Sequence, residues 1–173
     1  MKKNLYRGIR KDNGEWAFGF PFVGETSSYI LYAKMSSGSG SMFFEFDGVE
    51  VFPETVGQYT GLPDKYGEWI FEGDIVKQTF EKAIREPFEY DLYGEDVGTV
   101  VIYGEDVGPV VLLPSKGVCI KNPISLRKTD GEVDISGKKL KMYKEVCSGR
   151  CEIIGNIHDN PELLLESKEE CNT

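Results

Sequence analysis

Short apolar segments that each end at glycine or at a turn-forming pair run through most of this sequence. Glu15–Phe20 alternates aromatic residues with polar or small ones, a period typical of a half-buried β-strand. Asp12-Asn13-Gly14 just before it is a turn signal, so Leu5–Lys11 and Glu15–Phe20 are predicted to form a β-hairpin. With 20 glycines in 173 residues and no collagen-like period, the sequence predicts a mainly β fold with many turns.

Further strands and one short helix are predicted from the same signals. The strand candidates are Tyr29–Ala33, Phe43–Phe46, Val49–Phe52, Trp69–Phe71, Ile75–Phe80 and Cys151–Ile157. Ser36–Ser41 is expected to be a polar loop. Turns are expected at Asp47-Gly48, Pro63–Gly67 and Glu72–Asp74. Asn160-Pro161-Glu162 begins a short C-terminal helix, because asparagine suits the cap, proline the first turn and glutamate the positive end of the helix dipole.

Pro53–Gly57 is expected to be a connector, and a boundary near Gly57–Gly61 divides the chain into two regions. Residues 1–57 are expected to form an N-terminal β-hairpin or meander region, and residues 58–173 an SH3-like small β-barrel region. The second expectation rests on a Gly-Asp turn that leads into an apolar strand at Gly73–Lys77 and on a glycine that opens another at Gly98–Val101. SH3-like barrels often begin in this way, because glycine is needed where their strands bend sharply.

An internal repeat lies in the middle of the chain. Tyr93–Val101 is echoed by Tyr103–Val111, and each copy begins Tyr-Gly-Glu-Asp-Val-Gly. The period is shorter than the unit of a solenoid or propeller, and two copies cannot form an array. The repeat is therefore expected to form a β-hairpin. Pro109 cannot donate a ladder hydrogen bond, which predicts that the second copy lies toward a sheet edge.

The charge balance limits the partners that this chain can bind. Its 29 acidic and 20 basic side chains give a net charge of -9, which argues against nonspecific nucleic-acid binding because phosphate neutralisation needs clustered lysine and arginine. The net charge is still compatible with nucleic-acid binding by a local basic patch. Its members would be Lys121, Arg127, Lys128, Lys138, Lys139, Lys141 and Lys144. Apolar runs such as Val110–Leu113 are too short to cross a bilayer, and no long apolar stretch follows the basic N-terminus, so a cytoplasmic protein is expected.

Few side chains suit nucleophilic catalysis. His158 is the only histidine, so any Ser-His-Asp or Cys-His arrangement must use it. It lies at a predicted strand end beside Asp159 and Asn160, where a solvated or capping role is ordinary. The four cysteines are expected to be reduced thiols. A zinc site is a less favoured alternative, and its ligands would be Cys119, Cys147, Cys151 and His158.

Three carboxylates lie close together in the sequence around Trp69–Phe71. Glu68, Glu72 and Asp74 could act as acid and base or hold a divalent metal, which is the chemistry of a metal-dependent hydrolase. The favoured interpretation is structural, with Glu72–Asp74 as a turn whose aspartate accepts hydrogen bonds from the local backbone. We therefore expect no catalytic residues, no metal and no cofactor.

Three blocks of sequence go beyond generic patterning. Glu54–Val76 and Glu152–Leu164 closely resemble the signature of the YopX family, and Tyr6–Trp16 resembles the opening of that family. The resemblance implies a small, largely β protein carried by phages, prophages and similar mobile elements of bacteria, with no established biochemical function and no catalytic residues to transfer. The chain departs from the family pattern at the duplicated Tyr-Gly-Glu-Asp-Val-Gly unit and near residues 121–150, which are interpreted as insertions.

These observations favour a non-enzymatic accessory protein of phage or prophage origin that acts by binding. A protein partner is preferred, either a host or phage protein or a second copy of the chain. The candidate contact residues are Tyr59, Tyr66 and Trp69, because aromatic rings around a turn can stack on a ligand. Nucleic-acid binding by the small barrel is the first alternative, and a metal-dependent hydrolase is the second.

Overall fold

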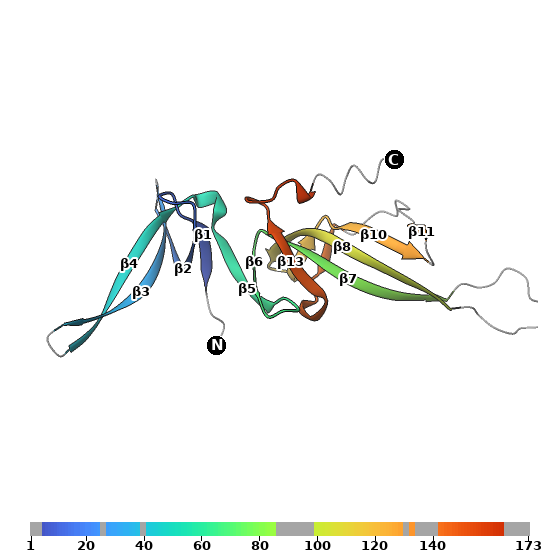
Figure 1. Ribbon diagram of the computed structural model, residues 1–173, viewed down its shortest axis with the longest axis horizontal. Helices are drawn as coiled ribbons and strands as arrows, with labels where there is room; N and C mark the ends of the chain where they lie inside the picture. The colour runs from blue at the N-terminus through green and yellow to red at the C-terminus, as the bar shows by residue number, and fades with distance from the viewer. Residues whose placement is uncertain are drawn as a thin grey trace, which may run out of the picture.

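The computed structural model describes residues 5–24, 27–38, 41–85, 99–129, 132–133 and 142–164. Within these ranges the protein is built from antiparallel strands in two sheets, which follow one another along the length of the molecule (Figure 1). The mainly β fold predicted from the sequence is therefore confirmed. No helix in the same ranges is long and apolar enough to cross a membrane.

The first sheet contains six strands. They are β1 (Tyr6–Ile9), β2 (Trp16–Val23), β3 (Ser28–Gly38), β4 (Ser41–Val51), β5 (Gly57–Pro63) and β6 (Trp69–Phe71). Their order across the sheet is β4-β3-β2-β1-β5-β6, and a 3-10 helix, η1 (Pro53–Thr55), connects β4 to β5. The predicted first hairpin is confirmed, because β1 and β2 pair from Tyr6–Gly19 to Ile9–Trp16.

The hairpin of β3 and β4 is longer than the sequence predicts. These strands pair from Ser28–Val51 to Gly38–Ser41, so the turn predicted at Asp47-Gly48 is wrong, and so is most of the loop predicted at residues 36–41. Residues 39 and 40 lie outside the described ranges. Gly48 packs against Leu31, whose Cδ2 would lie 2.6 Å from a Cβ at this position. The glycine therefore permits close packing between two strands and does not end one.

The end of β4 returns to the end of β1 and encloses a small interior. A bridge pairs Arg10 with Val51, which is fully buried together with Ile30. A Cβ on Gly8 would lie 3.1 Å from Val51 Cβ, and a Cβ on Gly19 would lie 3.0 Å from Ile30 Cγ2. Larger side chains do not fit at Gly8 and Gly19, and the phenylalanines of β2 therefore lie on the opposite face of the sheet.

The second sheet contains seven strands. They are β7 (Asp74–Arg85), β8 (Thr99–Leu113), β9 (Gly117–Lys121), β10 (Ile124–Thr129), β11 (Glu132–Val133), β12 (Tyr143–Glu145) and β13 (Cys151–Asn156). The main path is β11-β10-β8-β7-β13, while β9 pairs with β8 and β12. A 3-10 helix, η2 (Ser148–Arg150), precedes β13.

The pairing of the second sheet corrects one expectation about its architecture. Its described strands follow an open path with β11 and β13 at opposite ends, so the closed SH3-like barrel expected from the sequence is not found in them. Strand β5, which begins at the predicted domain boundary, pairs with β1 through Tyr6–Gln58. The division into residues 1–57 and 58–173 stays a prediction.

The repeat does not form the predicted hairpin. Strand β8 contains the end of the first copy and the whole second copy without a turn between them, while residues 93–98 lie outside the described ranges. Pro109 is also not at a sheet edge, because it pairs with Ile75 of β7. On the other side of β8, the partner changes from β10 at Val107 to β9 at Val110. The proline therefore occupies the point at which β8 exchanges partners.

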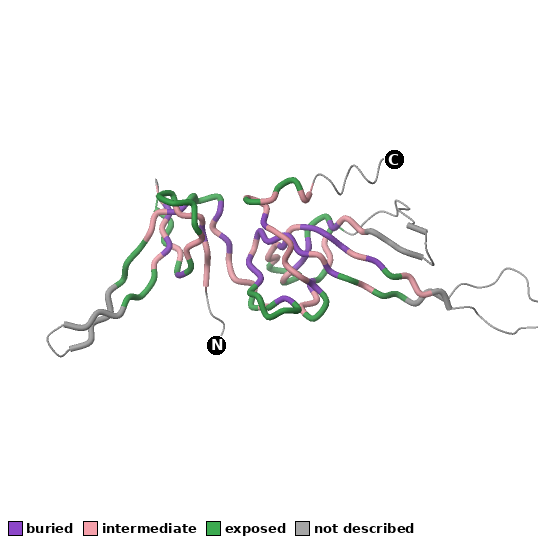
Figure 2. Tube along the Cα trace, viewed as in Figure 1, coloured by how far each residue is buried: buried purple, intermediate pink, exposed green. Residues whose placement is uncertain are grey.

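The hydrophobic core lies where β5 and β6 meet the second sheet. Its buried members are Ile70, Val76, Val110, Ile120, Val146 and Cys151. Figure 2 shows buried residues concentrated in this region, with more exposed residues along the two long hairpins. The predicted C-terminal helix is not found as an α-helix in the described residues: Asn160–Glu162 form a turn, only Leu163 and Leu164 are helical, and residues 165–173 lie outside the described ranges.

Candidate binding surface

Three phenylalanines form an exposed row on β2. Phe18, Phe20 and Phe22 alternate along the strand, so they project from the same face of the sheet. These residues are 49%, 58% and 56% exposed. The opposite face has no room for them, because even a Cβ on Gly19 would overlap the carbonyl oxygen of Leu31. Contiguous apolar surface of this kind marks an interaction site on a folded protein.

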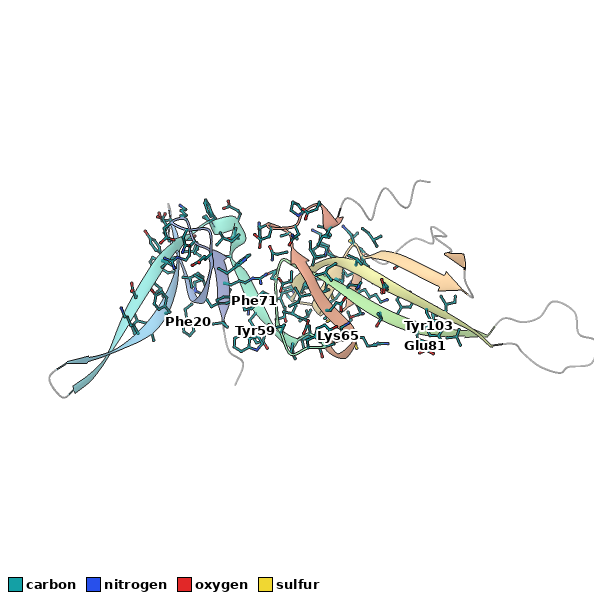
Figure 3. The ribbon with its side chains drawn as sticks, viewed as in Figure 1. Phe20, Tyr59, Lys65, Phe71, Glu81 and Tyr103 are labelled. Carbon is teal, nitrogen blue, oxygen red and sulfur yellow. The ribbon has the colours of Figure 1, made fainter. Side chains whose placement is uncertain are left out.

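The row continues across the sheet through contacts between aromatic rings. The ring centroids are 5.7 Å apart for Phe18 and Phe71, 5.6 Å for Phe71 and Tyr59, and 5.3 Å for Tyr59 and Trp69. Figure 3 shows Phe20 on the first sheet, with Phe71 and Tyr59 one above the other nearer the second sheet. We call this set the aromatic face: Phe18, Phe20, Phe22, Tyr59, Trp69 and Phe71, in which Phe71 is buried, with 2% of its surface exposed, and links Phe18 to Tyr59.

Of the three aromatic residues predicted as contacts, the structure brings two together. Tyr59 and Trp69 belong to the aromatic face, whereas Tyr66 lies in the turn between β5 and β6 and is 73% exposed. Asp64 holds this turn, because its Oδ1 accepts hydrogen bonds from the backbone N–H of Tyr66 at 2.8 Å and of Glu68 at 3.0 Å. The turn predicted at residues 63–67 is therefore confirmed.

A buried ion pair joins the first sheet to the second beside the aromatic face. Arg7 Nη2 on β1 donates to Asp74 Oδ1 on β7, and both side chains are largely buried. The guanidinium lies 4.3 Å from the ring centroid of Trp16 and 4.7 Å from that of Phe71. Asn156 Nδ2 also donates to Asp74 Oδ1, at 3.3 Å. These contacts fix the positions of the two sheets relative to one another.

The structure supports the structural interpretation of the predicted carboxylate group. Asp74 Oδ2 accepts a hydrogen bond from the backbone N–H of Phe71 at 2.7 Å, which confirms the predicted turn. Glu72 Oε1 accepts one from the backbone N–H of Leu112 at 3.3 Å. Within the described ranges, no three His, Cys, Asp or Glu side chains are placed to hold a metal ion. Glu72 and Asp74 therefore serve the packing of β6, β7 and β8.

A pocket opens at the junction of the sheets and takes its walls from both of them. Its volume is about 440 Å³. It is lined by Arg7, Phe18, Gly67, Glu68, Trp69, Phe71 and Ile153. We call it the junction pocket. Four of these residues belong to the aromatic face or to the ion pair that supports it, so the pocket and the face form one continuous surface.

Glu152 on β13 connects the β5–β6 turn to β7, and this connection depends on pH. Its carboxylate pairs with Lys65 and with Lys77 Nζ, the latter at 2.8 Å. The hydrogen bonds from Lys65 and Lys77 lower the pKa of Glu152 from 4.5 to about 2. A lowered pKa means that this carboxylate stabilises the folded chain above pH 4.5 and loses that contribution as the pH falls toward 2.

The Glu152→Gln variant is therefore expected to lose less stability than the parent between pH 4.5 and pH 2. Urea unfolding at a series of pH values measures this difference. Because the pair is near the surface, added salt should reduce it. Equal slopes of unfolding free energy against pH in the two proteins would show that the Glu152 ion pairs do not stabilise the fold.

Among the described residues, Cys119, Cys147, Cys151 and His158 do not come together in a group that could hold a metal ion, and Cys171 lies outside these residues. Cys119 and Cys151 are buried free thiols, and burial raises the pKa of Cys151 to about 11 and raises that of Cys119. Cys147 is a half-buried free thiol. His158 donates its backbone N–H to Asn156 Oδ1 at 2.9 Å, in the turn after β13. This is the local, structural environment that the sequence favoured for the histidine.

One residue of the predicted basic patch, Lys144, forms an ion pair within the protein. Lys144 Nζ pairs with the buried carboxylate of Asp106, which also accepts a hydrogen bond from Ser125. Lys144 lies 4.1 Å from the ring centroid of Phe80. Lys121 is exposed. The other predicted members, Arg127, Lys128, Lys138, Lys139 and Lys141, have side chains that lie outside the described structure.

The sequence predicts a strand at β2 but does not identify Arg7 or four phenylalanines as functional candidates: Phe18, Phe20, Phe22 and Phe71. A usable signal was present for the phenylalanines of β2. Gly19 and Pro21 alternate with them, so one face of the strand carries only compact residues and suits a shallow interior. No local signal identifies Arg7, because its partner Asp74 is 67 residues away.

Comparison with known proteins places the chain in a family. A crystal structure of protein EF1440 from Enterococcus faecalis is similar, with 21% sequence identity, a TM-score of 0.40, and coverage of 92% of this chain and 96% of the other. No curated protein matches the chain. The family model described as YopX protein matches residues 5–165, which include both sheets and the whole aromatic face. The chain therefore belongs to the YopX family.

Proposed function

We propose that this YopX-family chain is an accessory protein of phages or prophages that acts in the bacterial cytoplasm by binding another protein, and that it catalyses no reaction. The observation that carries the proposal is the aromatic face. Phe18, Phe20 and Phe22 expose about half of their surface on one side of β2, and Trp69 is 44% exposed beside them. Monomeric proteins rarely expose contiguous aromatic surface unless a partner covers it.

The chemistry of this surface favours a protein over a nucleic acid. Aromatic residues are enriched at the centres of protein interfaces, where they bury much area for little loss of side-chain freedom. The acidic excess of the chain opposes phosphate binding, and Lys144 is already paired with Asp106. The contact surface predicted around Tyr59 and Trp69 is part of this face, and we extend it to Phe20 and Phe22.

Replacing Phe20 and Phe22 together by serine is expected to reduce capture of the partner about tenfold or more, because two central aromatic anchors are lost. The measurement is quantitative affinity capture from lysogenic or phage-infected cells, with equal amounts of parent and variant protein. Both side chains are largely exposed, so the thermal unfolding temperature should change little.

Tyr103→Ser supplies the matched control, because Tyr103 is also an exposed aromatic on a strand but lies on the β7–β8 hairpin, away from the aromatic face (Figure 3). It should leave capture unchanged. Unchanged capture by the Phe20/Phe22 variant, with loss in Tyr103→Ser, would move the binding surface to the hairpin. If nucleic acid were recovered in place of protein, the proposed partner class would be wrong.

A further inference from the structure

We infer that the outer edge of β4 binds an extended segment of the partner protein as an added antiparallel β-strand, and that this segment alternates apolar with basic residues. This inference rests on the proposed function and specifies how the partner is held and what chemistry it presents. Strand β4 is the last strand of the first sheet, with β3 on one side and no described strand along the other (Figure 1). An edge of this kind presents backbone N–H and C=O groups with which another chain can pair.

The hydrogen bonds at the end of β4 show which backbone groups face this edge. The C=O of Glu50 accepts a hydrogen bond from the N–H of Lys11 at 3.0 Å, on the side away from β3. Every second residue of an antiparallel strand points its backbone groups the same way, so those of Gly48 and Phe46 also face the edge. Among the described residues, the N–H and C=O of Phe46 and the C=O of Gly48 have no hydrogen-bond partner. These three groups can therefore pair with an incoming strand.

An added strand would continue the aromatic face. Residues paired directly across neighbouring strands project from the same face of a sheet. Phe20 pairs with Leu31, and Leu31 pairs with Gly48. Phe46 lies two residues from Gly48, so it projects from that face as well, and it is 76% exposed. Apolar residues of the segment placed opposite Phe46 and Gly48 would extend the same surface.

The charge at this edge favours a basic residue between the two apolar ones. Asp47 Oδ1 accepts a hydrogen bond from the backbone N–H of Gly48 at 2.9 Å, which places this carboxylate at the outer edge of β4. Within the described ranges Asp47 forms no ion pair, whereas Glu50, where the free edge ends, pairs with Lys11. A hollow of about 430 Å³ beside Gly48 and Glu50 leaves space next to the strand.

A second copy of this chain fits the edge less well than a basic segment. Pairing between two β4 strands would bring the Asp47 carboxylates of both copies together, and like charges on paired strands are destabilising. Each copy also carries a net charge of -9. A basic segment reverses both effects and gains from the negative charge of the whole chain.

The probe for the edge is the peptide acetyl-Lys-Val-Lys-Val-Lys-Val-Lys-amide. Titration of the ¹⁵N-labelled full chain should shift the amide signals of Phe46 and Gly48, and it should slow hydrogen exchange at the Phe46 N–H because that group becomes hydrogen-bonded. The same peptide with glutamate in place of every lysine should bind at least about fivefold more weakly.

Methylated peptides test strand pairing directly. The valines would lie opposite Phe46 and Gly48, so their N–H groups would face β4 and the lysine N–H groups would face away. N-methylation of the valines should therefore weaken binding about tenfold or more, and N-methylation of the lysines should change it much less. This pair of peptides is measured on the parent protein and needs no variant to fold. Equal binding of the two methylated peptides would overturn the inference.

Two pairs of variants locate the site on β4. Phe46→Pro removes an N–H that does not belong to the pairing with β3, so the β3–β4 hairpin should persist while affinity for the peptide falls about tenfold. Phe46→Leu keeps that N–H and an apolar side chain, and its affinity should stay within about twofold of the parent. Asp47→Asn should weaken binding about threefold, whereas Glu54→Gln, which removes an exposed carboxylate from η1, should not.

The outcomes separate this inference from the proposed function. Loss of partner capture in the Phe20/Phe22 variant, with no binding of the lysine–valine peptide at Phe46, would leave the protein-binding function and remove the edge site. Binding of the peptide at Phe46, with partner capture insensitive to every change on the aromatic face, would leave the edge site and remove the proposed function. A chain that sediments as a dimer, and as a monomer after Phe46→Pro, would show that a second copy fills the edge and would overturn the inference.

Discussion

Replacing Asp74 by alanine is expected to lower the free energy of unfolding by about 3–5 kcal/mol, because it leaves the charge of Arg7 buried without a partner. The same change removes the acceptor for the Phe71 backbone N–H and for Asn156 Nδ2. Urea unfolding followed by far-UV circular dichroism measures the effect. It should be among the largest for any single polar residue in this chain, since Asp74 is 1% exposed.

A second arginine–aspartate pair provides the control for Asp74. Asp12 pairs with Arg10 near the surface, with 62% of the Asp12 side chain exposed, so Asp12→Ala should change the unfolding free energy little. The double variant Arg7→Met/Asp74→Asn removes both charges and should recover part of the stability lost in Asp74→Ala. Similar small losses in Asp74→Ala and Asp12→Ala would show that the buried pair does not hold the two sheets together.

Gly19→Ala is expected to cost about 3 kcal/mol or more, or to prevent folding, because the added Cβ would overlap backbone. At this position the new atom would be in steric overlap with the carbonyl oxygen of Leu31 and would lie 2.9 Å from its carbonyl carbon. Neither atom can move without disturbing the pairing of β2 and β3. Thermal or urea unfolding measures the loss of stability. Because Phe18, Phe20 and Phe22 belong to β2, disruption of this strand should also displace these side chains of the aromatic face.

Gly149→Ala is the matched control for Gly19→Ala. A Cβ at residue 149 would meet no atom within 4 Å, and the residue lies in the 3-10 helix η2. The change should therefore be close to neutral. A Gly19→Ala protein as stable as Gly149→Ala would mean that β2 and β3 separate easily and that the small interior of the first sheet is not tightly packed.

The parts of the fold that the sequence predicts correctly depend on neighbouring residues. The hairpin around Asp12–Gly14, the turn held by Asp64 and the turn at Glu72–Asp74 all use residues whose own conformation or side chain closes the turn. The β6 strand at Trp69–Phe71 and most of β13 follow in the same way from short apolar runs. Mainly β structure was therefore predictable.

The features that the sequence predicts wrongly depend on residues far apart in the chain. The pair Asp47-Gly48 is typical of a turn, yet Gly48 lies in the middle of β4, where it pairs with Leu31 of β3 and packs against its side chain. The repeat is typical of a hairpin, yet it lies within the single strand β8, because β7 pairs with that strand continuously from Thr99 to Pro109. Glycine permits both tight turns and close packing, and only the partner strand decides between them.

The candidate site was predictable only in part, for a related reason. Tyr59 and Trp69 could be chosen because the sequence around them is rich in aromatics and turns. Their ring contacts with Phe71, and the contact of Phe71 with Phe18, require β5 and β6 to lie beside β1 and β2. Arg7 and Asp74 are 67 residues apart and come into contact only in the folded chain, so no local sequence motif predicts the pair.

The position of β1 between β2 and β5 sets an order of events during synthesis. One partner, β2, emerges from the ribosome soon after β1, and β4 follows to form the Arg10–Val51 bridge. The second partner and Asp74 emerge later, and joining them to β1 closes a long loop at an entropic cost. The first hairpins of the nascent chain can therefore form early, while the Arg7–Asp74 ion pair can form only after Asp74 has been synthesised.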